Sequence, residues 1–334
     1  MLRYIVRRVL SAIPVLFGLS VILFLFLRLL PGNPAVAILG QHATPQLVAQ
    51  INASLGLDKP LYVQYLQYVW QLLHGDFGAS FVDGRTVAST FLVRFPATIE
   101  LTIGALIFAV GLGIPLGRLA ARHPNSWIDG AVTVLSLFGI SIPIFVLGYT
   151  LVFIFGVELH WLPAVGQIDP RLNVNPVTNF AIIDAVLSGR PAAVEDAFAH
   201  LILPAIALGS IPLAIVTRIT RASVIDVSNE DYVRTARAKG LAESRVDDRH
   251  IMRNAWLPVT TVIGLQVGSL LAGAVITETV FAWNGVGSWV VTAIENHDLI
   301  VVQSLIMIFA IIFLTVNLLV DIGYAVLNPR IRYG

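Results

Sequence analysis

The sequence predicts an all-α integral membrane protein with six membrane-spanning helices, on the basis of its composition, its long apolar runs and its one long charged stretch. Of 334 residues, 57% are hydrophobic and only 12% are charged, and the mean hydropathy is +0.82. A water-soluble domain of this size needs more polar surface, whereas a spanning helix needs about 20 consecutive apolar residues. We therefore expect one membrane domain with no separate soluble domain.

The composition also excludes several kinds of site. A net charge of +1 gives no electrostatic basis for nucleic-acid binding. The chain has no cysteine, and its seven histidines are scattered singly, so neither a disulfide nor an intrinsic metal site is expected. No Gly-x-x-x-x-Gly-Lys-Ser/Thr motif occurs. Any ATP hydrolysis that drives this protein must therefore take place in another subunit.

The first expected span covers residues 9–30, which as a helix would be about 33 Å long and would cross a hydrocarbon core of about 30 Å. Arg3, Arg7 and Arg8 precede it. A cleaved signal peptide also begins with basic residues, but its apolar core is shorter and ends in an Ala-x-Ala site, which is missing here. We expect an uncleaved anchor with a cytoplasmic N-terminus.

Five further apolar runs complete the six predicted spans, at residues 97–120, 130–156, 201–217, 257–281 and 300–327. We expect residues 31–95 and 157–200 on the extracytoplasmic side and 218–256 as a cytoplasmic loop. Within 31–95, Asp58 as cap and Pro60 in the first turn predict a short amphipathic helix. Because about thirteen residues cannot cross a bilayer, this helix should lie at the outer surface or pack on the bundle.

The distribution of basic residues predicts the orientation. With the N-terminus inside, 15 of the 21 Lys and Arg residues lie on the cytoplasmic side. The other six are Arg28, Lys59, Arg85, Arg94, Arg171 and Arg190. Cytoplasmic loops carry the excess of Lys and Arg, so both termini and the charged loop are expected in the cytoplasm.

Glycines, prolines and carboxylates in the spans allow alternative interpretations. Prolines such as Pro14, Pro143 and Pro204 either kink helices that move during transport or are ordinary membrane-helix kinks. The small-residue pairs Gly113/Gly117 and Gly264/Gly268 favour close helix packing within one chain over contact with a second chain. Three carboxylates, Glu100, Glu278 and Asp321, lie near predicted span ends. Their position favours an interfacial or helix-terminal role over a proton relay.

The charged stretch at residues 228–256 is the most informative segment. Ser228 followed by Asp231 predicts a helix start, and Gly240 predicts its end. After it, Arg245, Arg249 and Arg253 recur every four residues, which predicts three cations on one helical face. On composition alone, this stretch could equally be a loop that only anchors the topology.

Two motifs in this stretch resemble the EAA loop of ABC importer permeases, in the form carried by the dipeptide, oligopeptide and nickel family. They are DYVRTARAKG at 231–240 and RHIMRNAWLPV at 249–259. Gly240 matches the general importer pattern, whereas Arg234 and Thr235 replace its Glu-Ala, and Leu257-Pro258 comes late. Similar stretches occur at residues 1–35, 55–81, 94–102, 160–163 and 278–290 and at the C-terminus.

The resemblance implies a type I ABC importer permease fold in the bacterial cytoplasmic (inner) membrane. It implies a second homologous permease, two ATPase subunits that hold ATP and Mg, and an extracytoplasmic substrate-binding protein as partners. It implies no catalytic residue and no cofactor in this chain. The implied ATPase-docking residues are Glu230, Asp231, Tyr232, Arg234, Ala236, Arg237, Lys239 and Gly240.

Within this implied site, Tyr232 and Ala236 are expected to fill an apolar groove on the ATPase, Arg237 and Lys239 to supply polar contacts, and Gly240 to form the corner. The cargo is expected to be a di- or oligopeptide. Alternatives are a nickel or glutathione importer of the same family, or a secondary transporter that needs no ATPase. An enzyme acting within the membrane has no supporting motif in the sequence.

Overall fold

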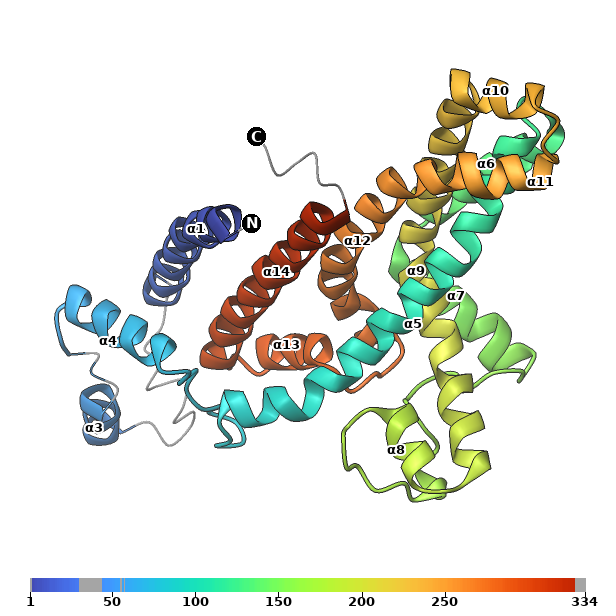
Figure 1. The fold of residues 1–334 in the computed structure, drawn as a ribbon. Helices are drawn as coiled ribbons and strands as arrows, with labels where there is room; N and C mark the ends of the chain where they lie inside the picture. Colours follow the sequence, from blue (N-terminus) through green and yellow to red (C-terminus); the bar gives the residue numbers. More distant parts are fainter. Residues whose placement is uncertain (1, 30–43, 55, 57, 328–334) are drawn as a thin grey trace. The chain divides into compact units, whose positions relative to one another are not determined.

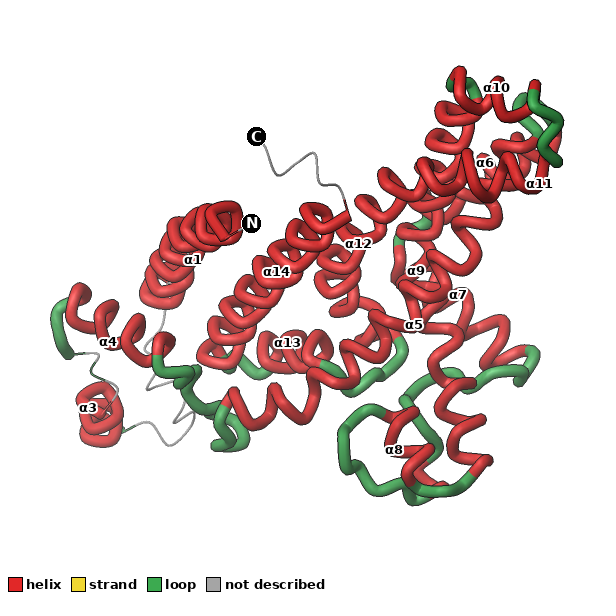
Figure 2. The backbone as a smooth tube through the Cα atoms, in the orientation of Figure 1, coloured by secondary structure: helices red, strands yellow, loops and turns green. Residues whose placement is uncertain are grey.

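The computed structural model describes residues 2–29, 44–54, 56 and 58–327, and every regular element among them is a helix (Figures 1 and 2). The Pro31 to Pro34 segment and the last residues of the C-terminal motif lie outside the described residues. Five helices are long and apolar enough to cross a membrane, and a bent helix pair is a sixth candidate. The chain divides into two compact units, residues 1–95 with 288–315 and residues 96–287 with 316–334.

The first unit contains α1 (Leu2–Leu29), α3 (Pro45–Ser54) and α4 (Leu61–Leu73). It also contains the start of α5 (Val87–Arg122), most of α13 (Val286–Glu295) and the first part of α14 (Leu299–Leu327). Helix α1 packs on α4, where the Ser20 and Tyr65 hydroxyls are 2.9 Å apart. The short helix predicted near residue 60 is confirmed, but Pro60 rather than Asp58 is its N-cap residue.

Helix α9 (Pro191–Ser228) is the central element of the second unit. It packs against α6 (Trp127–Ser141), α7 (Ile144–Leu151), α8 (Ala181–Leu187) and α12 (Arg253–Val280). Pro191 occupies its first turn, where the missing N–H costs nothing. The helix then continues through Pro204 and Pro212 for 38 residues. Because these helices all contact it, α9 fixes their positions relative to one another.

Glycines let α5 and α9 approach each other closely. A Cβ atom at Gly117 would lie 2.5 Å from the carbonyl oxygen of Thr217, and one at Gly209 would lie 2.7 Å from that of Ala105. At Gly113 it would meet Val216 at 3.0 Å. The prediction that Gly113 and Gly117 serve packing within one chain is therefore confirmed.

The range predicted as the third span contains two helical segments instead of one straight helix. Trp127–Ser141 and Ile144–Glu158 meet at an angle of 102°. The break falls at Ile142, and Pro143 is the N-cap residue of α7. The second segment ends in a π-helical stretch, η2 (Val152–Glu158). Proline at the break removes a backbone donor that a continuous helix would need.

Two buried carboxylates hold loops of the second unit in place. Glu100 on α5 accepts hydrogen bonds from the backbone N–H groups of Ala181 and Ile182, at 3.0 and 2.8 Å. Glu278 on α12 accepts one from the Thr98 hydroxyl at 2.6 Å, and the same hydroxyl accepts one from the backbone N–H of Val286. Glu278 lies near the end of α12, as predicted, whereas Glu100 lies inside α5 and contacts the first turn of α8.

We predict that Gly287→Ala will destabilise the second unit. A Cβ atom at this position would lie 2.5 Å from the Cα of Val275, so the backbone itself must move. Such overpacking costs about 1–3 kcal/mol. Thermal unfolding of the detergent-solubilised chain should begin at a lower temperature than in wild type. The matched control is Gly130→Ala, where no atom lies within 4 Å of the added group. Equal melting temperatures for the two variants would contradict the prediction.

Candidate functional site: the loop after α9

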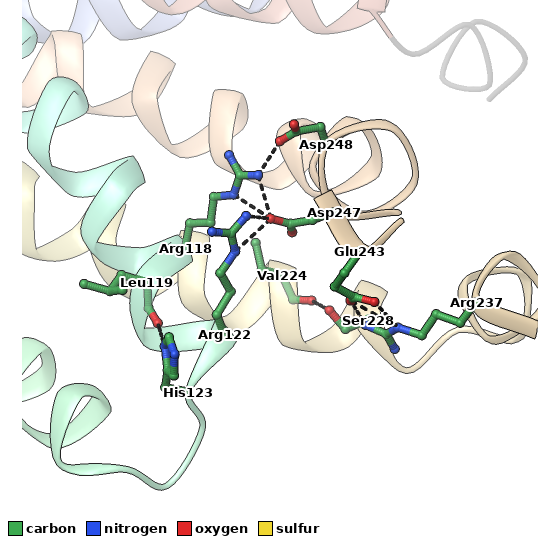
Figure 3. Close-up of polar contacts among 10 residues, drawn as sticks. All are labelled: Arg118, Leu119, Arg122, His123, Val224, Ser228, Arg237, Glu243, Asp247 and Asp248. Atoms are coloured by element: carbon green, nitrogen blue, oxygen red, sulfur yellow. Dashed lines mark hydrogen bonds and ion pairs between the residues drawn. The ribbon is translucent and has the colours of Figure 1, made fainter. Parts of the chain in front are cut away.

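The loop after α9 is a short helix bounded by two sharp turns. Helix α10 runs from Asp231 to Ala238, with Glu230 as its N-cap residue. Gly240, at a φ of +76°, follows it, so the predicted helix end is confirmed. The predicted start is wrong: Ser228 is the last residue of α9, and its hydroxyl donates to the carbonyl oxygen of Val224 at 2.6 Å (Figure 3). A hydroxyl satisfied within its own helix cannot cap the next one.

Most of the predicted docking residues lie on one exposed surface of this loop. Tyr232 is 42% exposed, and the side chain of Arg234 is 69% exposed. The remaining exposed members are Glu230, Asp231, Arg237, Lys239 and Gly240. We call these seven residues the α10 surface. It combines a tyrosine and two arginines, residue types that are enriched in protein interfaces, with one lysine and two carboxylates.

Ala236 does not belong to this surface, which corrects its predicted role. It is 5% exposed and lies in an apolar cluster with Val233 of α10 and residues of the following segment. The other members of this cluster are Val224, Val246, Ile251, Met252 and Ala255. A side chain packed against its own chain cannot fill a groove on a partner. Ala236 instead holds α10 onto the rest of the loop.

Two polar contacts fix the ends of α10. The Arg237 guanidinium donates to both carboxylate oxygens of Glu243, with the shortest bond at 2.7 Å across the Gly240 turn. This partner raises the pKa of Arg237 above its already high ordinary value, so the pair keeps its charge at physiological pH. At the other end, the Asn254 amide donates to the Tyr232 hydroxyl at 2.9 Å.

The segment that leads into α12 is π-helical, a geometry that the sequence pattern does not predict. After α11 (Glu243–Arg245), η4 runs from Val246 to Met252. Hydrogen bonds in a π-helix join residues five apart, so residues five apart, not four, lie near one another. The buried residues of η4 follow this spacing: Val246 and Ile251 are five residues apart, and so are Asp247 and Met252. Arg245, Arg249 and Arg253 are all exposed, and their common face stays a prediction.

An ion-pair cluster joins this π-helical segment to α5, and the sequence interpretation did not include it. Arg118 donates to Oδ2 of Asp247 through Nε at 2.8 Å and Nη2 at 2.6 Å (Figure 3). Arg122 donates to the same oxygen through Nε at 2.9 Å and also through Nη2. Asp248 contacts Arg118. Two signals are visible in the sequence: the two arginines are four residues apart, and the two aspartates are adjacent. Nothing in the sequence indicates that these arginines contact these aspartates.

Comparisons with known proteins match the whole chain. The family described as binding-protein-dependent transport system inner membrane component matches residues 113–333, and its N-terminal counterpart matches residues 1–102. A di/tripeptide transport system permease protein of Pseudomonas aeruginosa (strain UCBPP-PA14) is 47% identical over 100% of this chain and 99% of its own length.

Two relatives from Escherichia coli (strain K12) are also similar over their full lengths. A dipeptide transport system permease protein is 46% identical over 100% of this chain and 99% of its own length. A glutathione transport system permease protein is 42% identical over 100% of both chains. This multi-pass membrane protein therefore belongs to the family of binding-protein-dependent transport system inner membrane components, the permeases of ABC importers.

Proposed function

We propose that this chain is a permease subunit of an ATP-driven importer that moves di- or oligopeptides across the bacterial cytoplasmic membrane. The observation that carries the proposal is the end-to-end match to permeases named for di/tripeptide and dipeptide transport, at 47% and 46% identity. The permease named for glutathione transport matches at 42%. A small peptide is therefore favoured, and glutathione, itself a modified tripeptide, is the nearest alternative cargo.

The energy for transport comes from two ATPase subunits that bind the α10 surface on the cytoplasmic side. Tyr232 and Arg234 protrude from this surface and are available to a partner. ATP and Mg belong to those subunits. Closure of the ATPases moves α10, and alternating access follows from a change in the arrangement of the spanning helices.

The remaining partners are a second, homologous permease and an extracytoplasmic substrate-binding protein. The excess of basic residues near α10 supports a cytoplasmic location for this loop and for both chain termini. Residues 157–200 then face the opposite side. The small apolar cluster there, built on Ala185, Ala193 and Ala197, gives this insertion a fixed shape against which a binding protein could dock.

Uptake by whole cells tests the cargo and the energy source together. Cells that express the complete transport system should accumulate a radiolabelled dipeptide, and unlabelled di- and tripeptides should compete more effectively than glutathione or nickel. Depletion of ATP with the proton gradient preserved should stop uptake. Uptake that depends on the proton gradient and is unchanged by ATP depletion would instead establish a secondary transporter. Better competition by glutathione or nickel would identify the corresponding importer.

A further inference from the structure

Asp247 is an unusual residue for an exposed loop, because its carboxylate is almost completely buried. The side chain is 6% exposed, whereas that of the adjacent Asp248 is 65% exposed. Burial of a carboxylate is unfavourable unless charged partners compensate it. Such a residue in the loop that carries the α10 surface calls for a structural explanation.

The partners of Asp247 both come from the cytoplasmic end of α5. Two N–H groups of Arg118 and two of Arg122 converge on its Oδ2 atom. Charge-assisted bonds of this kind are about twice as strong as neutral ones. The arginine side chains are 28% and 47% exposed, so water can reach them if the carboxylate is lost. The cluster therefore depends on Asp247 more than on either arginine.

The same segment is held to α10 by apolar contacts. Val246 and Ile251 of η4 pack with Val233 and Ala236 of α10 in one buried cluster. Asp247 is thus attached on one side to α10, through its neighbours in η4, and on the other side to α5. While these contacts hold, a displacement of α10 must also displace α5.

Helix α5 leads from this cluster to the opposite end of the second unit. Arg118 and Thr98 are 20 residues apart in one continuous helix, or about 30 Å at 1.5 Å per residue. At Thr98, the hydroxyl donates to Glu278 of α12 and accepts from the backbone N–H of Val286. α5 therefore has polar attachments both at Arg118 and Arg122 and around Thr98, where Glu100 also accepts from Ala181 and Ile182.

We propose that Asp247 is a positioning residue that transmits the movement of α10 to α5 and so couples ATP hydrolysis to opening of the transport path. The proposal rests on the function proposed above. It assigns separate roles to two parts of one loop: the α10 surface binds the ATPases, and Asp247 passes on their motion. Loss of Asp247 should uncouple hydrolysis from transport without releasing the ATPase subunits.

The test compares Asp247→Asn with Asp248→Asn in the intact complex, purified and reconstituted into proteoliposomes. Three quantities are measured for each: ATPase subunits recovered, ATP hydrolysed, and labelled dipeptide transported. For Asp247→Asn we expect normal recovery and hydrolysis, with transport per ATP reduced about tenfold, a typical size for coupling between two sites. Asp248→Asn, the same change at a 65% exposed neighbour, removes one contact of Arg118 but leaves both arginines bonded to Asp247, so it should lower transport per ATP far less than Asp247→Asn does.

A third variant, Arg122→Gln, guards against a folding defect. It leaves Arg118 on Asp247 and should give an intermediate loss of transport per ATP at an unchanged melting temperature. Wild-type transport per ATP in Asp247→Asn would overturn the proposal, and so would loss of its ATPase subunits. If wild type itself shows no ATP-dependent dipeptide transport, the proposed function fails instead, which is a separate result.

Discussion

Replacing Tyr232 with aspartate is expected to release the ATPase subunits from the purified complex and to abolish dipeptide uptake. Tyr232 is the exposed aromatic residue of the α10 surface, and tyrosines in such positions commonly contribute 2 kcal/mol or more to binding, about a 30-fold change in affinity. Its hydroxyl accepts from Asn254, whose amide also donates to the carbonyl oxygen of His250. Asn254 therefore keeps a partner, and the melting temperature of the permease should be unchanged.

Two matched variants separate docking from folding. Tyr62→Asp makes the same change at a 69% exposed tyrosine on α4, and the ATPase subunits should stay bound. Ala236→Asp places a charge in the buried cluster beneath α10, at a cost of several kcal/mol. It should therefore lower the melting temperature as well as release the ATPases. Full recovery of ATPase subunits with Tyr232→Asp would show that the α10 surface is not the docking site.

The position and end of α10 could be predicted because its signals are local. Gly240 adopts a positive φ that glycine reaches without strain, so its place in the sequence marks the turn. The helix start predicted at Ser228 is wrong because the same local signal has two possible meanings. A serine near a helix boundary can cap the next helix or donate to a carbonyl oxygen of its own helix. Which of the two occurs here depends on where α9 ends, and α9 includes Ser228.

The division of α10 into an exposed and a buried side could not be predicted from this segment alone. Ala236 is buried by Val246 and Ile251, which lie ten or more residues later and belong to a π-helical stretch. A pattern that assumes 3.6 residues per turn assigns the wrong neighbours to such a stretch. The arginines of α5 show the same limit, since their partner Asp247 is 129 residues away from Arg118.

The long apolar helices were predictable because length and hydropathy alone identify them. Helix α9 covers the predicted span 201–217, and α12 covers the predicted span 257–281 except for its last residue; both continue into the loop that contains α10. Pro143 predicts a kink in the third predicted span, but the sequence does not predict the angle of 102° between the two helical segments. A proline shows where a helix can break, whereas the angle depends on the elements packed against both halves.

Gly117→Ala is expected to destabilise the second unit and to weaken the coupling of ATP hydrolysis to transport. The added Cβ would lie 2.5 Å from the carbonyl oxygen of Thr217 and 2.7 Å from the Cβ of Thr220, and both atoms belong to the rigid central helix α9. The two helices must therefore separate. We expect a lower melting temperature and, because Arg118 is the next residue, a loss of transport per ATP.

Gly111→Ala is the control that isolates this contact. It makes the same change in the same helix six residues earlier, where no atom lies within 4 Å of the new methyl group. Alanine is favoured over glycine within a helix by about 1 kcal/mol, so this variant should be as stable as wild type or slightly more stable. Equal stability of the two variants would mean that α5 and α9 are not held at the observed distance, and the attachment of α5 to Asp247 could then not transmit a fixed displacement.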